Sequence, residues 1–531
     1  MPPTPPPVHD YIIVGAGSAG CVLAHRLSAD PKVRVLLLEA GPNDSHPFLH
    51  MPAAAGKLRG RGMTWDDTTA PQPPLAGRTL RWPHGKVLGG SSAIDAMCYT
   101  RGAPADYDDW AAHGAEGWAW RDVLPWFRHA EGNGRGRDPL HGSDGPLTVS
   151  DLRHVDPHTR RFIEAGQQAG LPANADFNGP DPHGVGLYQV TQRDGARCSA
   201  ATAYLDRATR ARPNLTIVTG ARVNRVTFEH GRANGVVYAS ARGAFHQPAT
   251  REVLLCGGAV NSPQLLMLSG IGPALALRRH GLPVVHDAPD VGRNLQDALG
   301  IRIALPSDCP PRHRRMREAA IAWNYFVRGR RGAGTSNGFE AGGFFRSPLA
   351  GDDRADIQFH FAPAQLDAHD PRSFDAGCSL RACVLRPRSR GDVRLTGNRI
   401  SDRPRIDPGY LSDPAGFDLR MLVECARIAR TILAQAAFDG IRNAPLPPGD
   451  AASDDELAAF VRDQAESVLR AAGTCRMGTD DQAVVDPQLR VRGVAGLRVV
   501  DASVIPTLPG GDLNAPVVML AERAAALILQ A

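Results

Sequence analysis

Apolar and polar positions at the start of the chain follow one another in the order of a strand, a tight turn, a helix and a second strand. Tyr11 to Val14 form a short apolar run with β-branched residues, which is typical of a buried parallel strand. The turn residues Gly15 to Gly20 follow at once, and apolar positions with helical spacing continue to Leu27. A second apolar run from Val33 to Leu38 ends at Glu39. This pattern predicts a βαβ unit.

Later segments show other patterns. The stretch from Ala355 to Leu395 contains strand-like runs, among them the alternating Ile357 to Phe361 and the shorter Asp392 to Leu395. Two longer segments, Asp418 to Ala436 and Asp454 to Val468, fit helices. The chain therefore combines a βαβ unit with strands and helices of a different arrangement.

Length and composition narrow the class of protein. With 531 residues, the chain is too long for one ordinary core and suits two interleaved domains. Hydrophobic residues make up 43% and charged residues 22%, as in soluble globular proteins. The net charge is only +5 and the basic residues are nearly all arginines, so we expect no nucleic-acid partner. No apolar run is long enough for a membrane span.

The cysteines and the first residues bear on the compartment. The nine cysteines are scattered, without a CxxC pair or the spacing of a zinc site, so we expect free thiols and no metal. The leading segment MPPTPPPVHD lacks the charged and apolar regions of a signal peptide. A cytoplasmic location is the simplest interpretation.

The glycine turn has the chemistry of a dinucleotide site. Gly15 permits a tight turn, Gly17 lets backbone N–H groups approach a pyrophosphate, and Gly20 lets helix and strand pack closely. Glu39, at the end of the second strand, can accept hydrogen bonds from a ribose and would repel a 2′-phosphate. The unit predicts a dinucleotide other than NADP, but does not separate FAD from NAD.

Four longer segments, in order along the chain, resemble the landmarks of the glucose-methanol-choline (GMC) flavoprotein oxidoreductases. They are GKVLGGSSAI at Gly85–Ile94, GAVNSPQLLMLSGIG at Gly258–Gly272, GTCRMG at Gly473–Gly478 and VDASVIP at Val500–Pro506. The resemblance covers nearly the whole chain and implies FAD as the cofactor. Some members bind FAD covalently through a histidine in the first segment, where this chain has Ile94, so we expect non-covalent FAD.

The resemblance also implies the fold and the cofactor site. We expect an α/β protein with a Rossmann-like FAD-binding domain (1–150, 205–300 and 465–531) interleaved with an α+β substrate domain (151–204 and 301–464) built on an antiparallel sheet. The stretch from Ala355 to Leu395 would supply strands of that sheet, and Ala221 to Val226 a strand that places Val223 near the adenine. The residues expected to bind FAD are Gly15, Gly17, Ser18, Ala19, Gly20, Glu39, Ala40, Val87, Gly90, Ser91, Val223, Gly258, Asp501, Ala502 and Asn514.

The expected reaction centre departs from the family pattern. Arg470 stands where relatives that oxidise alcohols place a histidine, and Asp512 stands at the second catalytic position, usually histidine or asparagine. Asp95 replaces a common asparagine or histidine of the first segment. Arginine stays protonated, so Arg470 cannot be a base. We therefore expect Arg470, Asp512 and Asp95 to form an atypical centre.

Three interpretations of this centre stay open. Asp512 could be the base beside Arg470 as electrostatic partner, although an adjacent arginine would lower its pKa. Arg470 could instead anchor an acidic substrate, or the two residues could form a salt bridge in a site that has lost its chemistry. His84, His183, His286 and His360 lack paired spacing, so we expect them at the surface or in the core.

The expected function is oxidation of the CH–OH group of an alcohol, possibly an acidic one, by hydride transfer to FAD. Oxygen or a quinone would reoxidise the flavin. The alternative is a non-redox or photochemical FAD enzyme of the same fold, such as a lyase, decarboxylase or isomerase. The substrate and the oligomeric state are not predicted.

Overall fold

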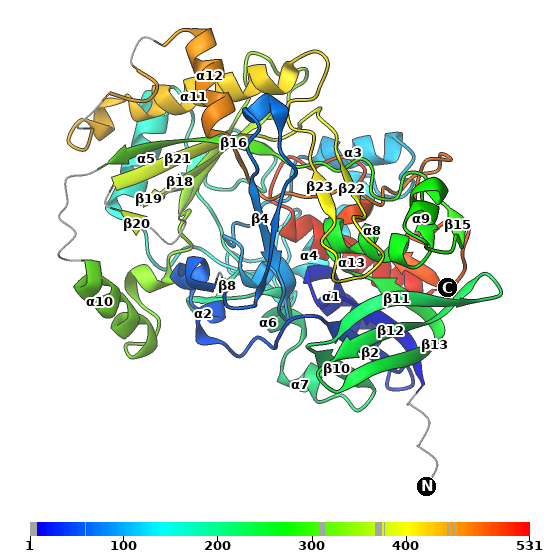
Figure 1. The fold of residues 1–531 in the computed structure, drawn as a ribbon. Helices are drawn as coiled ribbons and strands as arrows, with labels where there is room; N and C mark the ends of the chain where they lie inside the picture. The colour runs from blue at the N-terminus through cyan, green and yellow to red at the C-terminus, as the bar shows by residue number, and fades with distance from the viewer. Residues whose placement is uncertain are drawn as a thin grey trace.

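Two large β-sheets organise the chain, and helices pack against each of them (Figure 1). The computed structural model describes residues 8–58, 60–306, 314–366, 374–375, 377–442, 445–449 and 452–530. Eight of the nine cysteines lie in these ranges, where all are free and buried, and Cys309 lies outside them. No helix in the described ranges is long and apolar enough to cross a membrane.

The first sheet has seven strands in the order β10-β2-β1-β13-β12-β11, with β25 beside β13. Its bounds are β1 His9–Val14, β2 Val35–Glu39, β10 Leu215–Thr219, β11 Arg222–Glu229, β12 Arg232–Ser240, β13 Gly243–Leu255 and β25 Leu497–Val499. Strand β1 is parallel to both β2 and β13, so the predicted βαβ unit is at the centre of the parallel part. Strands β11 and β12 continue it as an antiparallel meander.

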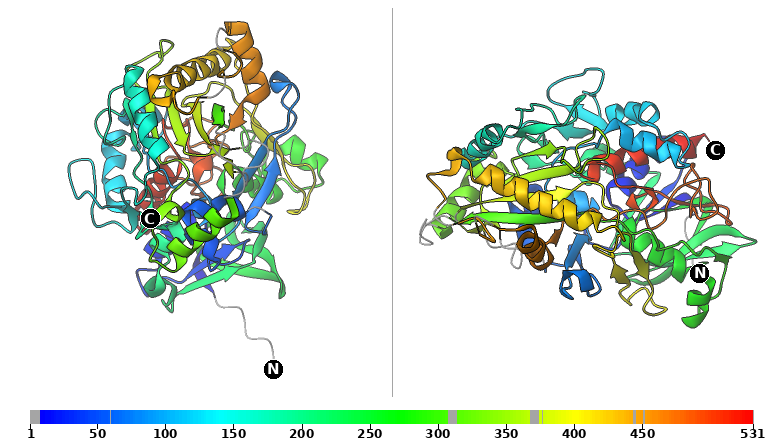
Figure 2. Two further views of the ribbon diagram at one scale, coloured as in Figure 1. Left: turned by 90° about the vertical axis from the view of Figure 1, so that its left-hand side faces the viewer. Right: turned by 90° about the horizontal axis from the view of Figure 1, so that it is seen from above.

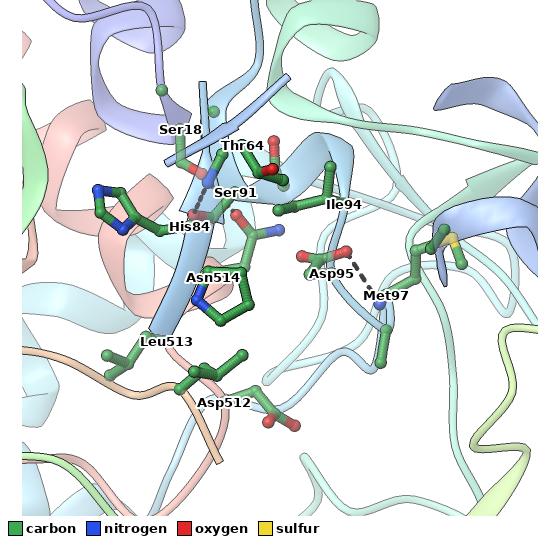
Figure 3. A pocket seen from close by; sticks show the side chains of 18 of the residues that line it. Ser18, Thr64, His84, Ser91, Ile94, Asp95, Met97, Asp512, Leu513 and Asn514 are labelled. Carbon is green, nitrogen blue, oxygen red and sulfur yellow. Dashed lines mark hydrogen bonds between the residues drawn. The ribbon is translucent and has the colours of Figure 1, made fainter. Parts of the chain in front are cut away.

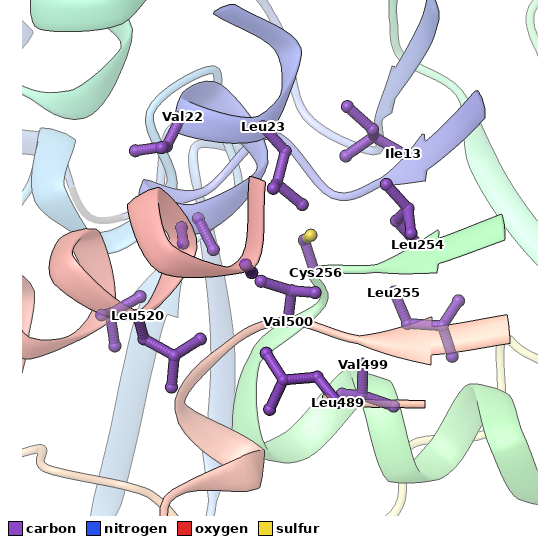
Figure 4. Close-up of a cluster of buried hydrophobic side chains, with 14 of the residues drawn as sticks. Ile13, Val22, Leu23, Leu254, Leu255, Cys256, Leu489, Val499, Val500 and Leu520 are labelled. Atoms are coloured by element: carbon purple, nitrogen blue, oxygen red, sulfur yellow. The ribbon is translucent and has the colours of Figure 1, made fainter. Parts of the chain in front are cut away.

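Helices α1 (Ser18–Leu27) and α13 (Asn514–Leu529) pack against each other beside this sheet, although they come from opposite ends of the chain. Figure 4 shows their apolar side chains meeting those of β1, β13 and β25, with Ile13, Leu23 and Leu255 among them. Helix α1 begins directly after Gly17 of the glycine turn, and its apolar side chains are buried in this core.

The second sheet has six antiparallel strands in the order β24-β16-β21-β18-β17-β7. Its bounds are β7 Gly184–Leu187, β16 Leu299–Pro306, β17 Ala341–Phe345, β18 Ile357–Ala362, β21 Gly377–Val384 and β24 Glu466–Ser467. Helices α5 (Pro157–Gln168), α11 (Phe417–Leu433) and α12 (Asp454–Gln464) pack on the sheet with Ile303, Phe359 and Leu380 in the shared core (Figure 2).

The other helices and strands lie outside the two large sheets and the helices described above. The helices are α2 Pro47–His50, α3 Pro104–Ala112, α4 Trp120–Ala130, α6 Ala200–Tyr204, α7 Arg207–Arg210, α8 Gly258–Leu268, α9 Ala274–Arg279 and α10 Arg314–Phe326. The remaining strands are β3 Thr64–Thr68, β4 Arg81–Gly85, β5 Glu131–Asn133, β6 Leu147–Val149, β8 Gln192–Arg193, β9 Ala196–Arg197, β14 Ile271–Gly272, β15 His286–Asp287, β19 Gln365–Leu366, β20 Phe374–Asp375, β22 Asp392–Arg394 and β23 Arg405–Asp407.

One expected strand is elsewhere. Asp392 to Leu395 was expected in the large antiparallel sheet, but β22 pairs only with β23 in a separate two-stranded sheet. Strand β21 ends at Val384, and β22 begins only at Asp392. Pro387 lies between them and has no N–H for a sheet hydrogen bond, so the strand does not continue through this segment. The helix expected to reach Val468 ends at Gln464, because the next residues pair with β16 as β24.

The predicted fold class is confirmed: a Rossmann-like parallel sheet is interleaved with an antiparallel one. Strands of the seven-stranded sheet come from the segments predicted for the FAD-binding domain. Strand β24 and the first two residues of β16 fall in those segments too, yet they belong to the antiparallel sheet. The division into domains otherwise stays a prediction.

Candidate active site

A cavity of about 1430 Å³ extends from the glycine turn after β1 to the antiparallel sheet. Residues from both sheets line it, including Val14 of β1 and His360 of β18. Figure 3 shows part of it, where Asp95, Asp512 and Asn514 surround the same space. The cavity is large enough to hold a dinucleotide and a small substrate together.

Most of the residues expected to bind FAD line this cavity. They are Gly15, Gly17, Ser18, Ala19, Glu39, Ala40, Gly90, Ser91, Val223, Gly258, Asp501, Ala502 and Asn514. Two others do not. A Cβ on Gly20 would lie 1.9 Å from the Gly15 carbonyl oxygen, so Gly20 serves helix packing. Val87 is fully buried in an apolar cluster with Leu49 and Leu58.

The glycine turn and the first signature touch each other. Gly15 has a φ of 101°, and a Cβ on Gly90 would lie 2.6 Å from the Gly17 Cα. Only glycines allow these two loops to approach so closely. Between them the backbone offers N–H groups at the start of α1, which suits a pyrophosphate.

Glu39 is buried at the end of β2, beside the turn. Its carboxylate accepts hydrogen bonds from the Ala16 N–H at 2.9 Å and the Gly41 N–H at 2.7 Å. Burial raises the pKa of Glu39 to about 7 despite these two donors. Hydroxyl donors from a ribose would favour the ionised carboxylate, so the site fits the adenosine end of FAD.

Asp501 and Asn514 join segments of the cavity wall through side-chain hydrogen bonds. The Asp501 carboxylate accepts hydrogen bonds from the Gly258 N–H at 2.8 Å, the Ser262 hydroxyl at 2.6 Å and the Ser503 N–H at 2.8 Å. It therefore positions the start of α8. The Asn514 Oδ1 accepts a hydrogen bond from the Ser18 hydroxyl at 2.8 Å, which joins the first residues of α1 and α13.

The expected Arg470–Asp512 ion pair is present. The Arg470 Nη2 donates to the Asp512 Oδ1 at 2.7 Å and to the Gln358 Oε1 at 2.5 Å. Asp297 Oδ1 accepts from the Arg470 backbone N–H at 2.6 Å and so fixes the loop that carries the arginine. The guanidinium is buried, whereas 27% of the Asp512 side chain is exposed toward the cavity.

The charge of Arg470 decides the state of Asp512. Burial alone would raise the pKa of Asp512, but Arg470 and the nearby imidazole of His360 outweigh burial and hold this pKa well below its usual range. Asp512 is therefore an ionised hydrogen-bond acceptor and a weak base. This result disfavours Asp512 as the group that takes a proton.

Asp95 lies in the same cavity with a different partner. The buried Arg197 donates through Nη1 to the Asp95 Oδ1 at 2.6 Å, and the Met97 N–H donates to the same oxygen at 3.0 Å (Figure 3). Burial raises the pKa of Asp95 to about 6, although Arg197 opposes the shift. The Oδ2 atom accepts no hydrogen bond from any residue that the structure describes.

His360 was expected at the surface or in the core, but the structure places it in the cavity wall. His360 is 2% exposed, lines the cavity, and places its Nε2 3.7 Å from the Asp512 Oδ1. Its ring stacks on Tyr188, with centroids 5.8 Å apart. Burial, followed by the charge of Arg381, lowers the pKa of His360 to about 4, so the imidazole is neutral at neutral pH. The alternation in Ile357 to Phe361 was the available signal, since it puts Gln358 and His360 on one face.

A dinucleotide cradle, an antiparallel sheet beside it and carboxylates lining the space between them fit a dinucleotide-dependent oxidoreductase. Comparison with known proteins agrees with this class. The family models of the N-terminal and C-terminal parts of GMC oxidoreductase match residues 9–299 and 387–521. The chain belongs to the GMC oxidoreductase family, as the sequence predicted.

Similar proteins cover the chain almost completely. An alcohol dehydrogenase [acceptor] of Pseudomonas putida is 45% identical, over 98% of this chain and 96% of its own length. The crystal structure of pyridoxine 4-oxidase from Mesorbium loti has a TM-score of 0.88 at 36% identity and covers 98% of both chains. A formate oxidase of Aspergillus oryzae RIB40, studied for FAD modification, has a TM-score of 0.89 at 26% identity, with 98% of each chain covered.

The cofactor is FAD. Glu39 at the adenosine end, the two touching glycine loops and the start of α1 fit its adenosine diphosphate half, as the contacts above show. Ile94 lines the cavity where some members carry a histidine that bonds to the flavin, and its side chain has no nucleophile. The FAD is therefore held non-covalently.

Proposed function

We propose that this protein oxidises the CH–OH group of a small alcohol to a carbonyl group. One observation supports the proposal most: Asp95, Asp512 and Arg470 line the same cavity as the FAD cradle. An oxidation of this kind needs a proton acceptor and charge stabilisation beside the electron acceptor, and these three residues supply both. The name of the Pseudomonas putida relative agrees with this reaction.

The reaction divides into a hydride and a proton. The alcohol carbon loses hydride, which carries two electrons, and the hydroxyl oxygen loses a proton, so that the C–O single bond becomes a C=O bond. FAD supplies the two-electron acceptor. The protein must supply the acceptor for the proton.

Asp95 is the proposed proton acceptor. Its pKa, raised to about 6 by burial, is the nearest to neutral pH among the three polar residues expected in the reaction centre. Its Oδ2 has no hydrogen-bond donor among the described residues, and so it can take the hydroxyl proton.

Arg470 and Asp512 have a positioning and electrostatic role in this proposal. Ionised Asp512 can accept a hydrogen bond from the substrate, and Arg470 keeps it ionised and oriented. Arg470 itself is a poor anchor for an acidic substrate, because Asp512 and Gln358 already occupy its Nη2 and the group is buried.

An anaerobic reduction screen tests the proposal. Alcohols, including hydroxy acids, are mixed with the oxidised holoenzyme, and the flavin absorbance is followed by stopped flow. We expect at least one alcohol to bleach the flavin, and Asp95→Asn to slow the bleaching. Product formation without bleaching would instead favour the non-redox or photochemical alternative. Reoxidation by oxygen or by a quinone analogue then identifies the acceptor.

A further inference from the structure

Three basic side chains stand in a row across the antiparallel sheet, on the wall of the active-site cavity. Arg302 of β16 pairs with Arg381 of β21, and Arg381 pairs with His360 of β18. Directly opposite residues in antiparallel strands share one face of the sheet. All three residues line the cavity, whereas their sequence neighbours Ile301 and Phe359 belong to the core under the helices.

Within this row, the directly opposite Arg302 and Arg381 oppose folding, because like charges opposite each other destabilise a sheet. Glu466 of β24 compensates part of this repulsion. Its Oε1 accepts a hydrogen bond from the Arg302 Nη2 at 2.6 Å and lies 3.8 Å from the Arg381 Nη1. One carboxylate thus faces two guanidinium groups, and it binds the first of them.

Arg381 has only this longer contact with Glu466 as an ion pair among the described residues. Among the residues that the structure describes, its guanidinium donates no hydrogen bond, and its Nε is buried without a partner. The side chain is 14% exposed, and the guanidinium lies over the Phe339 ring at 5.0 Å from the centroid. An arginine carries five N–H donors in a planar fork that matches a carboxylate.

The open guanidinium is next to the reaction centre. His360 is the cross-strand neighbour of Arg381, and its Nε2 is 3.7 Å from the Asp512 Oδ1. Cross-strand neighbours are about 5 Å apart, so a group bound to Arg381 lies within the length of a small molecule from Asp512. Phe339 also lines the cavity and offers an aromatic face beside the arginine.

We propose that Arg381 binds the carboxylate of the substrate, so that the alcohol oxidised by this protein is a hydroxy acid. The oxidation of a hydroxy acid rests on the proposed function, whereas the binding of a carboxylate by Arg381 does not. The proposal makes Arg381 the anchor of an acidic substrate in place of Arg470, which is buried and whose Nη2 already binds Asp512 and Gln358.

Binding without turnover tests the anchor directly. Benzoate and its neutral counterpart benzamide are titrated into the oxidised holoenzyme, and the change in flavin absorbance gives each dissociation constant. We expect benzoate to bind roughly 10-fold to 100-fold more tightly than benzamide, as a charge-assisted pair predicts. Arg381→Gln should abolish this preference, and Arg381→Lys, which keeps the charge without the fork, should keep part of it.

Arg346→Gln is the matched control. Arg346 directly follows β17 of the same sheet, is about half exposed, and pairs with Asp353 at 2.6 Å. This variant should keep the full preference for benzoate. A wild-type holoenzyme without the preference, or an Arg381→Gln holoenzyme that keeps it, overturns the proposal.

Reduction by a matched pair of substrates separates the anchor from the reaction. 4-(Hydroxymethyl)benzoate should reduce the flavin with a kcat/KM at least 10-fold above that of 4-(hydroxymethyl)benzamide. Equal values overturn the role of Arg381 and leave alcohol oxidation standing. If no alcohol reduces the flavin but benzoate still binds through Arg381, the proposed function fails and the anchor stands.

Discussion

Arg470 and Asp512 form an ion pair of 2.7 Å at the two positions where alcohol-oxidising relatives are expected to carry histidine or asparagine. The arginine is buried and also binds Gln358 of the antiparallel sheet, so the pair joins the C-terminal segment to the substrate side of the cavity. It cannot take up a proton as a histidine would, because arginine stays protonated and the pKa of Asp512 is held low. A proton acceptor must therefore be found elsewhere in the cavity.

Asp512→Asn should destabilise the holoenzyme and slow flavin reduction. The substitution leaves the Arg470 charge buried without its partner, which costs about 3 kcal/mol in the free energy of unfolding. Urea unfolding at saturating FAD measures this loss, and stopped flow measures the reduction rate.

The double variant Arg470→Met/Asp512→Leu is the matched control for that experiment. It removes both charges, so it should recover most of the lost stability while flavin reduction stays slow. If the single variant is as stable as the wild type, the ion pair does not hold the site together.

Asp95 should set the pH dependence of flavin reduction. Its pKa is about 6, so below that pH it is protonated and cannot accept the hydroxyl proton. We expect the limiting reduction rate to rise with pH through an apparent pKa near 6 and then to level off. Asp95→Asn should lower the rate by about 10²-fold to 10⁴-fold and remove this rise. An unchanged pH profile in Asp95→Asn would exclude Asp95 as the proton acceptor.

His360 should make the protein sensitive to acid. In the unfolded chain a histidine titrates near pH 6.5, whereas in the fold burial lowers the pKa of His360 to about 4. Between these values the unfolded state binds a proton that the folded state does not, so stability falls as the pH falls. From pH 7 to pH 4.5 this contribution amounts to about 2 to 3 kcal/mol.

His360→Gln should remove that part of the acid sensitivity, as measured by the free energy of unfolding at the two pH values. His230→Gln provides the comparison, because the His230 side chain is 92% exposed. The free energy of unfolding should then fall less between pH 7 and pH 4.5 in His360→Gln than in the wild type, and by the same amount in His230→Gln as in the wild type. The same loss of stability in all three proteins would contradict the proposed neutral, buried state of His360.

The cofactor site could be predicted from the sequence because most of its first residues lie close together along the chain. The strand at Tyr11, the turn at Gly15 and the acid at Glu39 follow one another within one βαβ unit, and each has a short-range signal. The family resemblance added the distant Asn514, which meets Ser18 in the fold. Local pattern and resemblance together were enough for the FAD site.

The wall of the cavity that the antiparallel sheet forms could not be predicted in the same way. His360 and Arg381 meet only through the register of β18 and β21, and a shift of one residue would turn either side chain to the other face. Arg197 reaches Asp95 across 102 positions of the sequence. No short-range pattern encodes these two pairings, so they had to come from the structure, whereas the Arg470–Asp512 pair was expected from the sequence.

Gly90→Ala should weaken FAD binding by more than 10-fold. A Cβ at this position would lie 2.6 Å from the Gly17 Cα, so the two loops that line the cofactor end would have to separate. Gly90 also has a φ of 56°, which costs an alanine about 1 to 2 kcal/mol whatever its surroundings.

Gly220→Ala isolates that second effect, because Gly220 has a φ of 65° but nothing within 4 Å of a Cβ. Titration of each apoprotein with FAD, followed by flavin fluorescence, gives the dissociation constants. Gly220→Ala should lose stability and keep its FAD affinity, whereas equal affinities in the two variants would mean that the contact of the two loops does not shape the FAD site.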